Sequence, residues 1–491
     1  MSSRGICAAG HELTAQAGAR VLREGGNAVD AALAAMLVSW VAEPLLTGPG
    51  AGGYLLVAGA GVEPTLLDFF VAAPGAGADP EHVRGDLVAV DVSFGDAVQV
   101  FHGGAAACGA YGTPAGIVAA SERWGTVPLE QLAAPAARLA RDGVPLSAQQ
   151  AYVFEILEGI LTLTPESAAI FAPHGPLREG ELFHCPELGD TIERLGREGA
   201  RPFYEGDIAQ AAVRYLAERG GVLTAEDLRG YEAIEREPVR ARYRGREVIT
   251  NPPPSAGGIL IALALAELDR GEGPPSLHDV VAAMEHMQSA RTAEFVDGLA
   301  EPGFAQRFLT GRLGSTTHIS TVDGAGLACS VTCTNGEGAG MVVPGTGIQV
   351  NNIMGEQDLS PHGFHTAPPG RRMPSMMAPT AVLRDGEPEL VLGSAGSNRI
   401  RSAILQTIIG VVDHGLRAEA AVQAPRVHFE AGLLYAEPGV PVEDLHAEEH
   451  QIVSFRAPNL FFGGVQAVER DPSGALSGAG DPRRGGAAVA A

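Results

Sequence analysis

The sequence predicts an α+β protein, and three observations support this class. Residues 121–143 and 190–229 carry the apolar spacing of helices. After residue 316 the chain consists mostly of β-branched, apolar segments separated by glycine-rich turns, which is typical of strands. The 491-residue chain is 45% hydrophobic, which is enough to build a large core around both kinds of element.

Two helices are expected near the N-terminus. The span His11–Glu24 has helical apolar spacing, and Gly25-Gly26 follows it as a C-cap. Asn27 is a suitable N-cap for a second helix, with Asp30 in its first turn. Because a proline disfavours helical geometry in the residue before it, Pro44 should end this helix near Glu43.

A glycine-rich segment follows the second helix. Residues 48–53 match the spaced-glycine pattern of dinucleotide-binding loops. Such a loop needs a strand before it and a helix after it, whereas here a helix precedes it and a predicted strand at 54–57 follows. We therefore assign these glycines to close backbone packing.

The later elements follow in chain order. A strand is predicted over Arg240–Thr250, where three prolines at 252–254 stop it, and helices are predicted over 259–270 and 277–297. In the last third we expect a β-hairpin, and then helices near 402–414 and 418–424.

The hairpin has a readable register. Strands are predicted over 317–322 and 327–334, separated by the turn sequence Asp-Gly-Ala-Gly at 323–326. A three-residue loop at 324–326 would place Thr316 directly across from Thr334, with Cβ atoms about 5 Å apart. A two-residue loop would shift the register by one residue and break this pairing. Because strand neighbours alternate between faces, His318 should point away from Thr317 and into packing.

Thr316 has two interpretations. It is a good strand residue, and on the hairpin alone this interpretation is preferred. It could instead become a chain terminus if the Ser315–Thr316 bond is cut. A terminal threonine carries both a nucleophilic hydroxyl and a base, namely its free α-amine with a pKa of about 7.7–8.0. Inside the chain the same nitrogen is an amide and cannot accept the proton, so the second interpretation requires cleavage.

Composition excludes several classes of function. The net charge is −24, and all 34 basic residues are arginine. Nucleic acid is therefore disfavoured as a partner, because phosphate binding needs a basic face. The absence of lysine excludes a Schiff-base mechanism and a Walker A lysine. The five scattered cysteines do not form a disulfide framework, which fits a reducing compartment.

No membrane or export segment is expected. The first residues lack an apolar signal region, and the longest apolar run, 31–42, is shorter than the roughly 20 residues of a membrane span. We therefore expect a cytoplasmic protein without a membrane partner. His362 and His365 lie in a Pro/Gly-rich loop without acidic partners, so we predict no metal site there.

A series of short motifs runs along nearly the whole chain. These are Gly25-Gly26-Asn27-Ala28-Val29-Asp30, Glu43-Pro44, Gly112-Thr113-Pro114-Ala115-Gly116, Asn251-Pro252-Pro253-Pro254-Ser255, Thr316-Thr317-His318, Pro344-Gly345-Thr346-Gly347, Gly393-Ser394-Ala395-Gly396-Ser397-Asn398-Arg399-Ile400 and Asp481-Pro482-Arg483-Arg484. In content and order they resemble the γ-glutamyltransferase (γ-glutamyl transpeptidase) family of the N-terminal-nucleophile hydrolase superfamily.

The resemblance implies a four-layer αββα sandwich built from both fragments of one precursor. Residues 1–315 would form the large (α) subunit region and residues 316–491 the small (β) subunit region, paired as a heterodimer with a higher oligomer possible. It also implies a self-processing enzyme that transfers γ-glutamyl groups, from donors such as glutathione, to water or to an amino acid. Neither a metal nor an organic cofactor is implied.

The resemblance further assigns roles to individual residues. They are Thr316 as the nucleophile released by cleavage after Ser315, Thr334 as the second threonine that contacts it, Gly396 and Ser397 as the backbone oxyanion hole, Ser375 as a contact of the substrate carboxylate, Glu356 near the acid that binds the donor's α-amino group, and Asn335 near a substrate-binding asparagine. The position of Thr334 agrees with the hairpin register.

Departures from the family pattern keep two alternatives open. The family's arginine that clamps the donor carboxylate is missing after Asp68-Phe69, and Met376 replaces the second of two serines. The chain could therefore be an N-terminal-threonine acylase for another acyl group, such as glutaryl or a cephalosporin side chain. Ser397 and Glu356 also leave room for an uncleaved pseudoenzyme.

Overall fold

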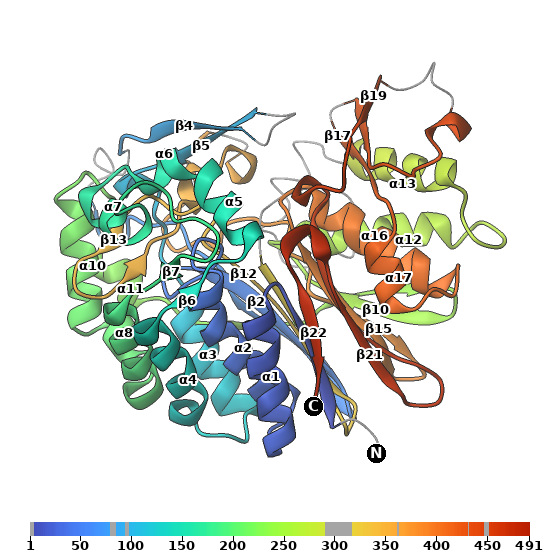
Figure 1. The fold of residues 1–491 in the computed structure, drawn as a ribbon, viewed down its shortest axis with the longest axis horizontal. Helices are drawn as coiled ribbons and strands as arrows, with labels where there is room; N and C mark the ends of the chain where they lie inside the picture. Colours follow the sequence, from blue (N-terminus) through green and yellow to red (C-terminus); the bar gives the residue numbers. More distant parts are fainter. Residues whose placement is uncertain are drawn as a thin grey trace.

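Two β-sheets pack face to face at the centre of the protein, and helices cover the outer face of each (Figure 1). The computed structural model describes residues 4–78, 85–93, 98–289, 317–360, 363–430, 432–445 and 451–491. Within these residues the layers run helix, sheet, sheet, helix. The predicted α+β class and αββα arrangement are therefore confirmed.

The first sheet joins strands from the beginning, the middle and the end of the chain. In sheet order they are β22 (Ala487–Ala490), β1 (Gly5–Ala9), β11 (Thr317–Asp323), β12 (Leu327–Thr334), β2 (Gly52–Gly59), β3 (Val62–Phe69) and β8 (Ile234–Arg236). All neighbouring pairs are antiparallel. The pairing of β1 with β22 brings the two ends of the chain to the same edge of the molecule (Figure 1).

The second sheet corrects one expectation. Its strands are, in sheet order, β21 (Leu476–Gly480), β20 (Gly464–Arg470), β16 (Glu387–Ala395), β15 (Thr380–Arg384), β10 (Arg246–Thr250) and β9 (Val239–Tyr243). The prediction of one strand over Arg240–Thr250 was wrong, because β9 and β10 form a hairpin. Arg244 and Gly245 both have positive φ, 49° and 76°, which closes a two-residue turn between them.

Helices α1 and α2 cover the first sheet as predicted. Helix α1 (Glu12–Glu24) begins at the N-cap His11 and ends at Gly25, whose φ of 99° is left-handed. Helix α2 (Ala28–Ala42) begins with a capping box between Asn27 and Asp30, and all of its residues are buried. Helix α3 (Thr113–Trp124) lies beside α2 and packs on β2 and β3 of the same sheet. Outside these helices lie α4 (Leu129–Asp142), α8 (Pro186–Glu198) and α10 (Asp207–Ala217).

Four further helices lie on the side of the second sheet. They are α12 (Gly257–Leu268), α13 (Leu277–Ser289), α16 (Arg399–Val412) and α17 (Ala418–Gln423). Helices α12, α16 and α17 pack on its strands, whereas α13 packs on α12. Each corresponds to a predicted helix, although the expected continuation of α13 to residue 297 lies outside the described residues. A small three-stranded sheet stands beside this half and consists of β17 (Val427–Glu430), β18 (Leu433–Ala436) and β19 (Gln451–Ser454).

Short elements complete the half that contains α1 and α2. They are α5 (Ala148–Ile156), α6 (Glu158–Leu161), α7 (Pro165–Phe171), α9 (Arg201–Tyr204), α11 (Ala225–Arg229), and the strand pairs β4 (Val88–Ser93) with β5 (Val98–Gly103), β6 (Val144–Pro145) with β7 (Leu182–Phe183), and β13 (Val342–Val343) with β14 (Ile348–Gln349). All five cysteines are buried and unbonded. No helix in the described part of the chain is long and apolar enough to cross a membrane.

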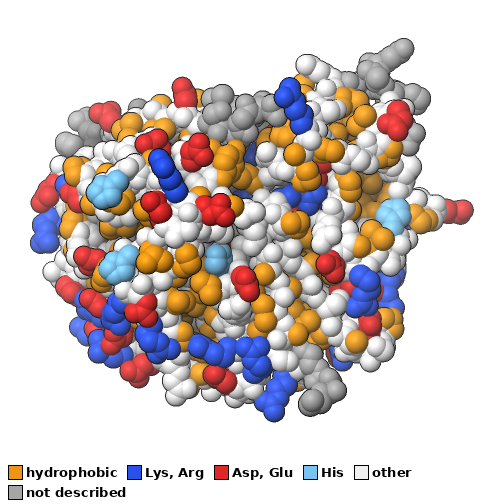
Figure 2. All heavy atoms as spheres, viewed as in Figure 1, with side chains coloured by type: hydrophobic (Ala, Val, Ile, Leu, Met, Phe, Trp, Pro, Cys, Tyr) orange, Lys and Arg blue, Asp and Glu red, His pale blue; other side chains and the backbone are white. Residues whose placement is uncertain are grey.

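Charged side chains of both signs are mixed on the outer helices. In Figure 2 arginines and acidic residues alternate over the lower left of the face in view, where α4 and α8 lie. Ion pairs there include Arg141 with Asp190 at 2.7 Å and Arg194 with Asp207 at 2.8 Å. Exposed pairs of this kind contribute little to stability, about 0–1 kcal/mol each.

Candidate active site

The hairpin that leads away from residue 316 has the predicted register. Thr317 pairs with Cys333 and Val322 with Ala328, so residues 324–326 form a three-residue loop. The carboxylate of Asp323 fixes this loop by accepting the N–H groups of Ala325 at 2.9 Å and Leu327 at 3.1 Å. Ser315 and Thr316 lie outside the described residues, so their roles stay predictions.

Thr317 contacts a buried carboxyl group. Its hydroxyl donates to Glu43 Oε2 at 2.9 Å, and the hydroxyl of Thr14 donates to Glu43 Oε1 at 3.0 Å. Glu43 is only 1% exposed. Burial raises its pKa to about 7, although the two hydroxyls and the charge of Arg484 act in the opposite direction.

His318 lies on the opposite face of β11, between the two sheets. Its ring contacts the hydroxyls of Thr332 at 2.8 Å and Ser320 at 2.9 Å. A Cβ added to Gly393 of the second sheet would lie 2.3 Å from this ring, so the two strands meet closely there. Burial lowers the pKa of His318 to about 3, so the ring is neutral. The prediction that His318 is a packing residue is confirmed.

Thr334, Asn335 and Glu356 come together at the end of β12. The N–H of Gly336 donates to Thr334 Oγ1 at 2.7 Å. A Cβ added to the same glycine would lie 2.4 Å from Glu356 Oε1, so this carboxyl group lies against the backbone two residues after the threonine. Asn335 is fully buried, and neither side-chain amide atom has a hydrogen-bond partner among the described residues. An unpaired buried amide costs about 1–3 kcal/mol, so this group is suited to a bound ligand.

Gly396 and Ser397 form a tight turn at the start of α16. Their φ angles are 117° and 58°, both positive. A left-handed conformation is unusual for a serine, so the surrounding structure must hold this turn in place. Ser397 is 4% exposed, and no acceptor in the described part of the chain takes a hydrogen bond from its backbone N–H. The N-terminus of a helix favours negative charge, so this N–H is suited to an oxyanion.

A cluster of charged groups around this turn was not assigned a role from the sequence. Arg484 approaches Gly396, since a Cβ added to the glycine would lie 3.2 Å from Arg484 Nη2. Burial and the charge of Arg399 lower the pKa of Arg484 to about 10, while Glu337 and Glu43 act in the opposite direction. Burial also raises the pKa of Glu337 to about 7. One signal for Glu43 was available, because it is the first charged residue after the apolar run 31–42.

Comparison with known proteins places the chain in a family. The family model for gamma-glutamyltranspeptidase matches residues 14–310 and 303–491. The chain belongs to this family.

Relatives within the family carry two kinds of name. The glutathione hydrolase proenzyme of Bacillus subtilis (strain 168) is 30% identical over 99% of this chain and 91% of that protein. The acylase ACY 1 proenzyme of Pseudomonas sp. (strain SE83) is 32% identical over 99% and 94%. The crystal structure of cephalosporin acylase from Bacillus halodurans has a TM-score of 0.85 at 26% identity, covering 99% of this chain and 96% of that chain.

Membership of the gamma-glutamyltranspeptidase family confirms the fold and the enzyme class expected from the sequence. The chain is an amidohydrolase or transferase of the N-terminal-nucleophile type. The comparisons do not distinguish the acyl group, because glutathione hydrolases and acylases match almost equally well.

Ser375 is placed differently from the other predicted site residues. It is 1% exposed, and its hydroxyl accepts the N–H of Met377 at 2.9 Å. Its carbonyl accepts the N–H of Ala256 at 2.8 Å. No hydrogen bond among the described residues joins Ser375 to the cluster at the end of β12. The neighbouring Met376 side chain is fully buried in the core of the second sheet and offers no polar contact.

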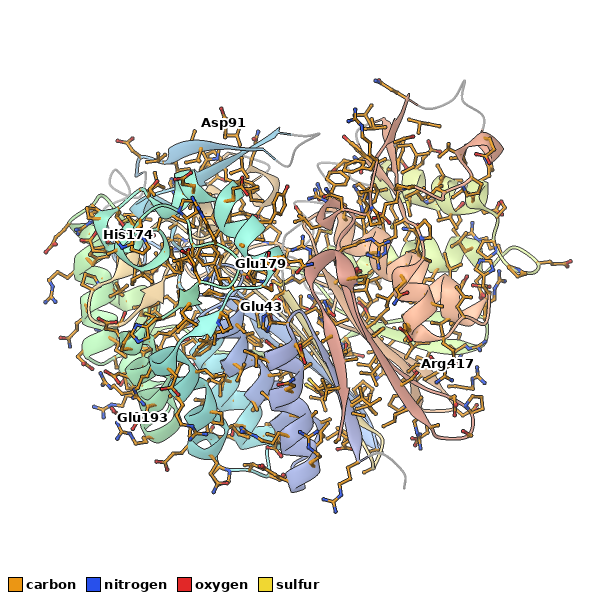
Figure 3. The ribbon with its side chains drawn as sticks, in the orientation of Figure 1. Glu43, Asp91, His174, Glu179, Glu193 and Arg417 are labelled. Carbon is orange, nitrogen blue, oxygen red and sulfur yellow. The ribbon has the colours of Figure 1, made fainter. Side chains whose placement is uncertain are left out.

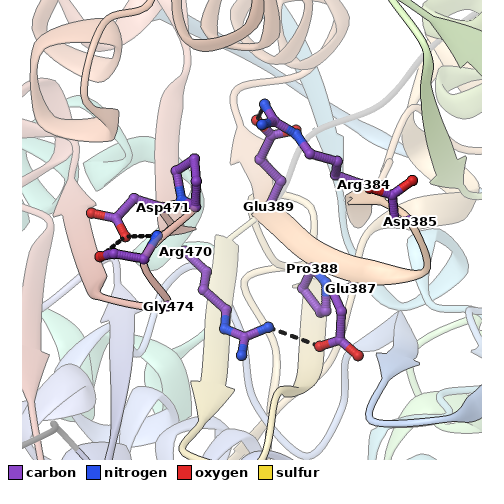
Figure 4. A pocket seen from close by; sticks show the side chains of 10 residues that line it. Arg384, Asp385, Glu387, Pro388, Glu389, Arg470, Asp471 and Gly474 are labelled. Carbon is purple, nitrogen blue, oxygen red and sulfur yellow. Dashed lines mark hydrogen bonds and ion pairs between the residues drawn. The ribbon is translucent and has the colours of Figure 1, made fainter.

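Neither His365 nor the hollow in Figure 4 is assigned a role in this site. His365 Nε2 contacts the carbonyl of Ala106 at 2.9 Å, whereas His362 lies outside the described residues. No cluster of three metal-ligating side chains occurs in the described part of the chain.

A hollow of about 360 Å³ lies between the β15–β16 and β20–β21 turns (Figure 4). Its charged groups bind each other, as in Arg470 with Glu387 at 2.8 Å.

Proposed function

We propose that the protein is a self-processing γ-glutamyl hydrolase or transferase that works through an acyl-enzyme on Thr316. The observation that carries this proposal is the end of β12, where a threonine hydroxyl and a carboxyl group both approach Gly336 and the preceding residue, Asn335, has a buried amide without a partner among the described residues. An acidic side chain beside a free amide suits the ammonium and polar groups of a glutamyl donor.

The proposed maturation step releases the base. Thr316 Oγ attacks the carbonyl carbon of Ser315, and the peptide becomes an ester by an N-to-O acyl shift. Water then hydrolyses the ester, which frees the Ser315 carboxylate and the α-amine of Thr316. Residues 1–315 and 316–491 would remain paired as a heterodimer, because β11 and β12 lie between β1 and β2 in one sheet.

The proposed turnover reuses the same hydroxyl. Thr316 Oγ attacks the γ-amide carbonyl of the donor, its proton passes to the α-amine, and the leaving amine then receives that proton. The N–H of Ser397 would stabilise the oxyanion, and one such donor contributes about 2.7–4 kcal/mol to lowering the barrier. Water or an amino-acid amine accepts the acyl group. Thr334 would orient the nucleophile.

A second candidate is an acylase for a group without an α-amine. It is favoured by the buried Met376, by the missing arginine after Asp68-Phe69, and by the acylase relatives. In this case the fold, the nucleophile and the oxyanion hole would be unchanged, and only the pocket for the acyl group would differ.

Two chromogenic anilides distinguish the candidates. Full-length protein and its Thr316→Ala variant are assayed with γ-glutamyl and glutaryl p-nitroanilide. The proposal predicts a preference for the γ-glutamyl compound of at least about tenfold in kcat/KM, and no activity in the variant. A glutaryl preference would instead establish the acylase. An uncleaved chain without activity on any amide would leave the pseudoenzyme.

A further inference from the structure

Glu43 joins three segments that are far apart in the chain. It is the C-cap residue of α2. Its carboxylate accepts one hydrogen bond from the hydroxyl of Thr14, in the first turn of α1, and another from the hydroxyl of Thr317, at the start of β11. Figure 3 shows it in the interior of the molecule, above the α1 and α2 helices. The fit is close, because a Cβ added to Gly10 would lie 2.3 Å from Glu43 Oε2 and 3.3 Å from Thr317 Oγ1.

A carboxyl group at this position is costly unless it has a use. It is 1% exposed and lies at the negative end of the α2 dipole. Two hydroxyl groups are its hydrogen-bond partners among the described residues, and no ion pair there joins it to a cation. Arg484 is the charged group that acts on it from a distance, and Arg484 is itself influenced by Arg399, Asp481 and Glu337.

Thr317 is covalently bonded to Thr316. Any group that fixes the Thr317 side chain therefore also fixes the start of the strand from which the proposed nucleophile extends. The hydrogen bond from Thr317 to Glu43 fixes this start of the strand from the helix side of the sheet. On the opposite face, the ring of His318 is hydrogen-bonded to the hydroxyl of Thr332.

We propose that Glu43 is a positioning residue for the reaction. It anchors Thr317 and supplies the negative charge that balances the ammonium formed on the α-amine of Thr316. This inference rests on the proposed function. When Thr316 Oγ attacks, its proton moves to the α-amine, which becomes an ammonium group. The Glu43 carboxylate stabilises that ammonium until its proton passes to the leaving amine, and Glu43 itself gains and loses no atom in turnover.

The role of a counter-charge has a kinetic signature that a purely structural role lacks. A nearby carboxylate raises the pKa of an amine, and removing the charge lowers it. In Glu43→Gln the hydrogen-bonding shape is kept and the charge is lost. The ascending limb of kcat against pH should therefore move to lower pH by about one unit. Above that limb kcat should fall by up to about tenfold because the amine is a weaker base, while KM should change by less than about twofold.

Two further variants complete the test. Thr14→Val removes one hydrogen bond but leaves the charge, so the limb should stay in place. Glu43→Asp keeps the charge but withdraws it from Thr317, so kcat should fall while the limb moves by much less than in Glu43→Gln. If Glu43→Gln does not fold, Glu43→Asp still tests the proposal. This variant keeps the negative charge, so a shift of its ascending limb by about one pH unit, the shift expected for a lost charge, would overturn the proposal.

The possible outcomes separate the two proposals. If wild-type protein neither splits nor hydrolyses an anilide, the proposed function fails. If wild type is active and Glu43→Gln keeps both its pH profile and its kcat, the function stands and the role of Glu43 is wrong. A uniform loss of kcat with the limb unmoved would reduce Glu43 to an ordinary packing residue.

Discussion

The raised pKa of Glu43 predicts how stability should depend on pH before cleavage. Burial raises the value from 4.5 to about 7 in the uncut chain. Between these two values the folded protein keeps a proton that the unfolded chain has already released, so the free energy of unfolding falls as pH rises. A shift of that size corresponds to about 3 kcal/mol, lost over roughly pH 4.5 to 7. Glu43→Gln has no such proton to lose.

The assay compares Thr316→Ala with the Thr316→Ala, Glu43→Gln double variant. The first change removes the proposed nucleophile, so that by the proposal the chain stays uncut and no α-amine is released at residue 316. Urea unfolding at several pH values gives the free energy of unfolding for each protein. Glu337 also has a raised pKa, but it is present in both proteins and its contribution cancels in the difference. We expect the free energy of unfolding of the double variant to rise by about 3 kcal/mol relative to that of its parent between pH 4.5 and 7.5. Parallel curves would show that Glu43 is ionised at a normal pKa, and the reasoning from burial would then be refuted.

Three further predictions concern neighbouring residues. Gly10→Ala places a methyl group 2.3 Å from Glu43 Oε2, so thermal unfolding should reveal a loss of about 1–3 kcal/mol, whereas Gly271→Ala, whose nearest atom is 3.5 Å away, should change stability by less than about 0.5 kcal/mol. Ser397→Gly keeps the N–H and relieves the left-handed φ of 58°, so kcat should stay within about threefold of wild type; a loss of a hundredfold would assign chemistry to the serine side chain itself. Asn335→Leu removes a buried amide without partners among the described residues, so denaturation should show a gain of about 1 kcal/mol while KM for the γ-glutamyl anilide rises about tenfold; an unchanged KM would remove Asn335 from the substrate pocket.

Local chemistry explains which parts of the fold could be predicted from the sequence. The caps of α1 and α2 depend on residues next to each helix, and the hairpin register depends on the turn sequence after Asp323. The β9–β10 turn was missed because Arg244-Gly245 is not one of the usual turn pairs, and its positive φ angles are visible only in the structure.

The candidate site was predicted in part for a similar reason. The position of Thr334 follows from the register of one hairpin, and Asn335 comes from the family resemblance. The partners of Glu43 come from α1 and β11, which no local pattern relates. Arg484 reaches the Gly396 turn from near the end of the chain, so its role also depends on the tertiary fold. Ser375 is also assigned by resemblance, and in the structure its hydroxyl oxygen accepts the N–H of Met377.

The central claim is that a backbone cut gives Thr316 a free amine. Intact mass measurement and N-terminal sequencing of the most active fraction test it directly. We expect two chains, 1–315 and 316–491, with threonine as the first residue of the second. Full activity in a single continuous chain would contradict it.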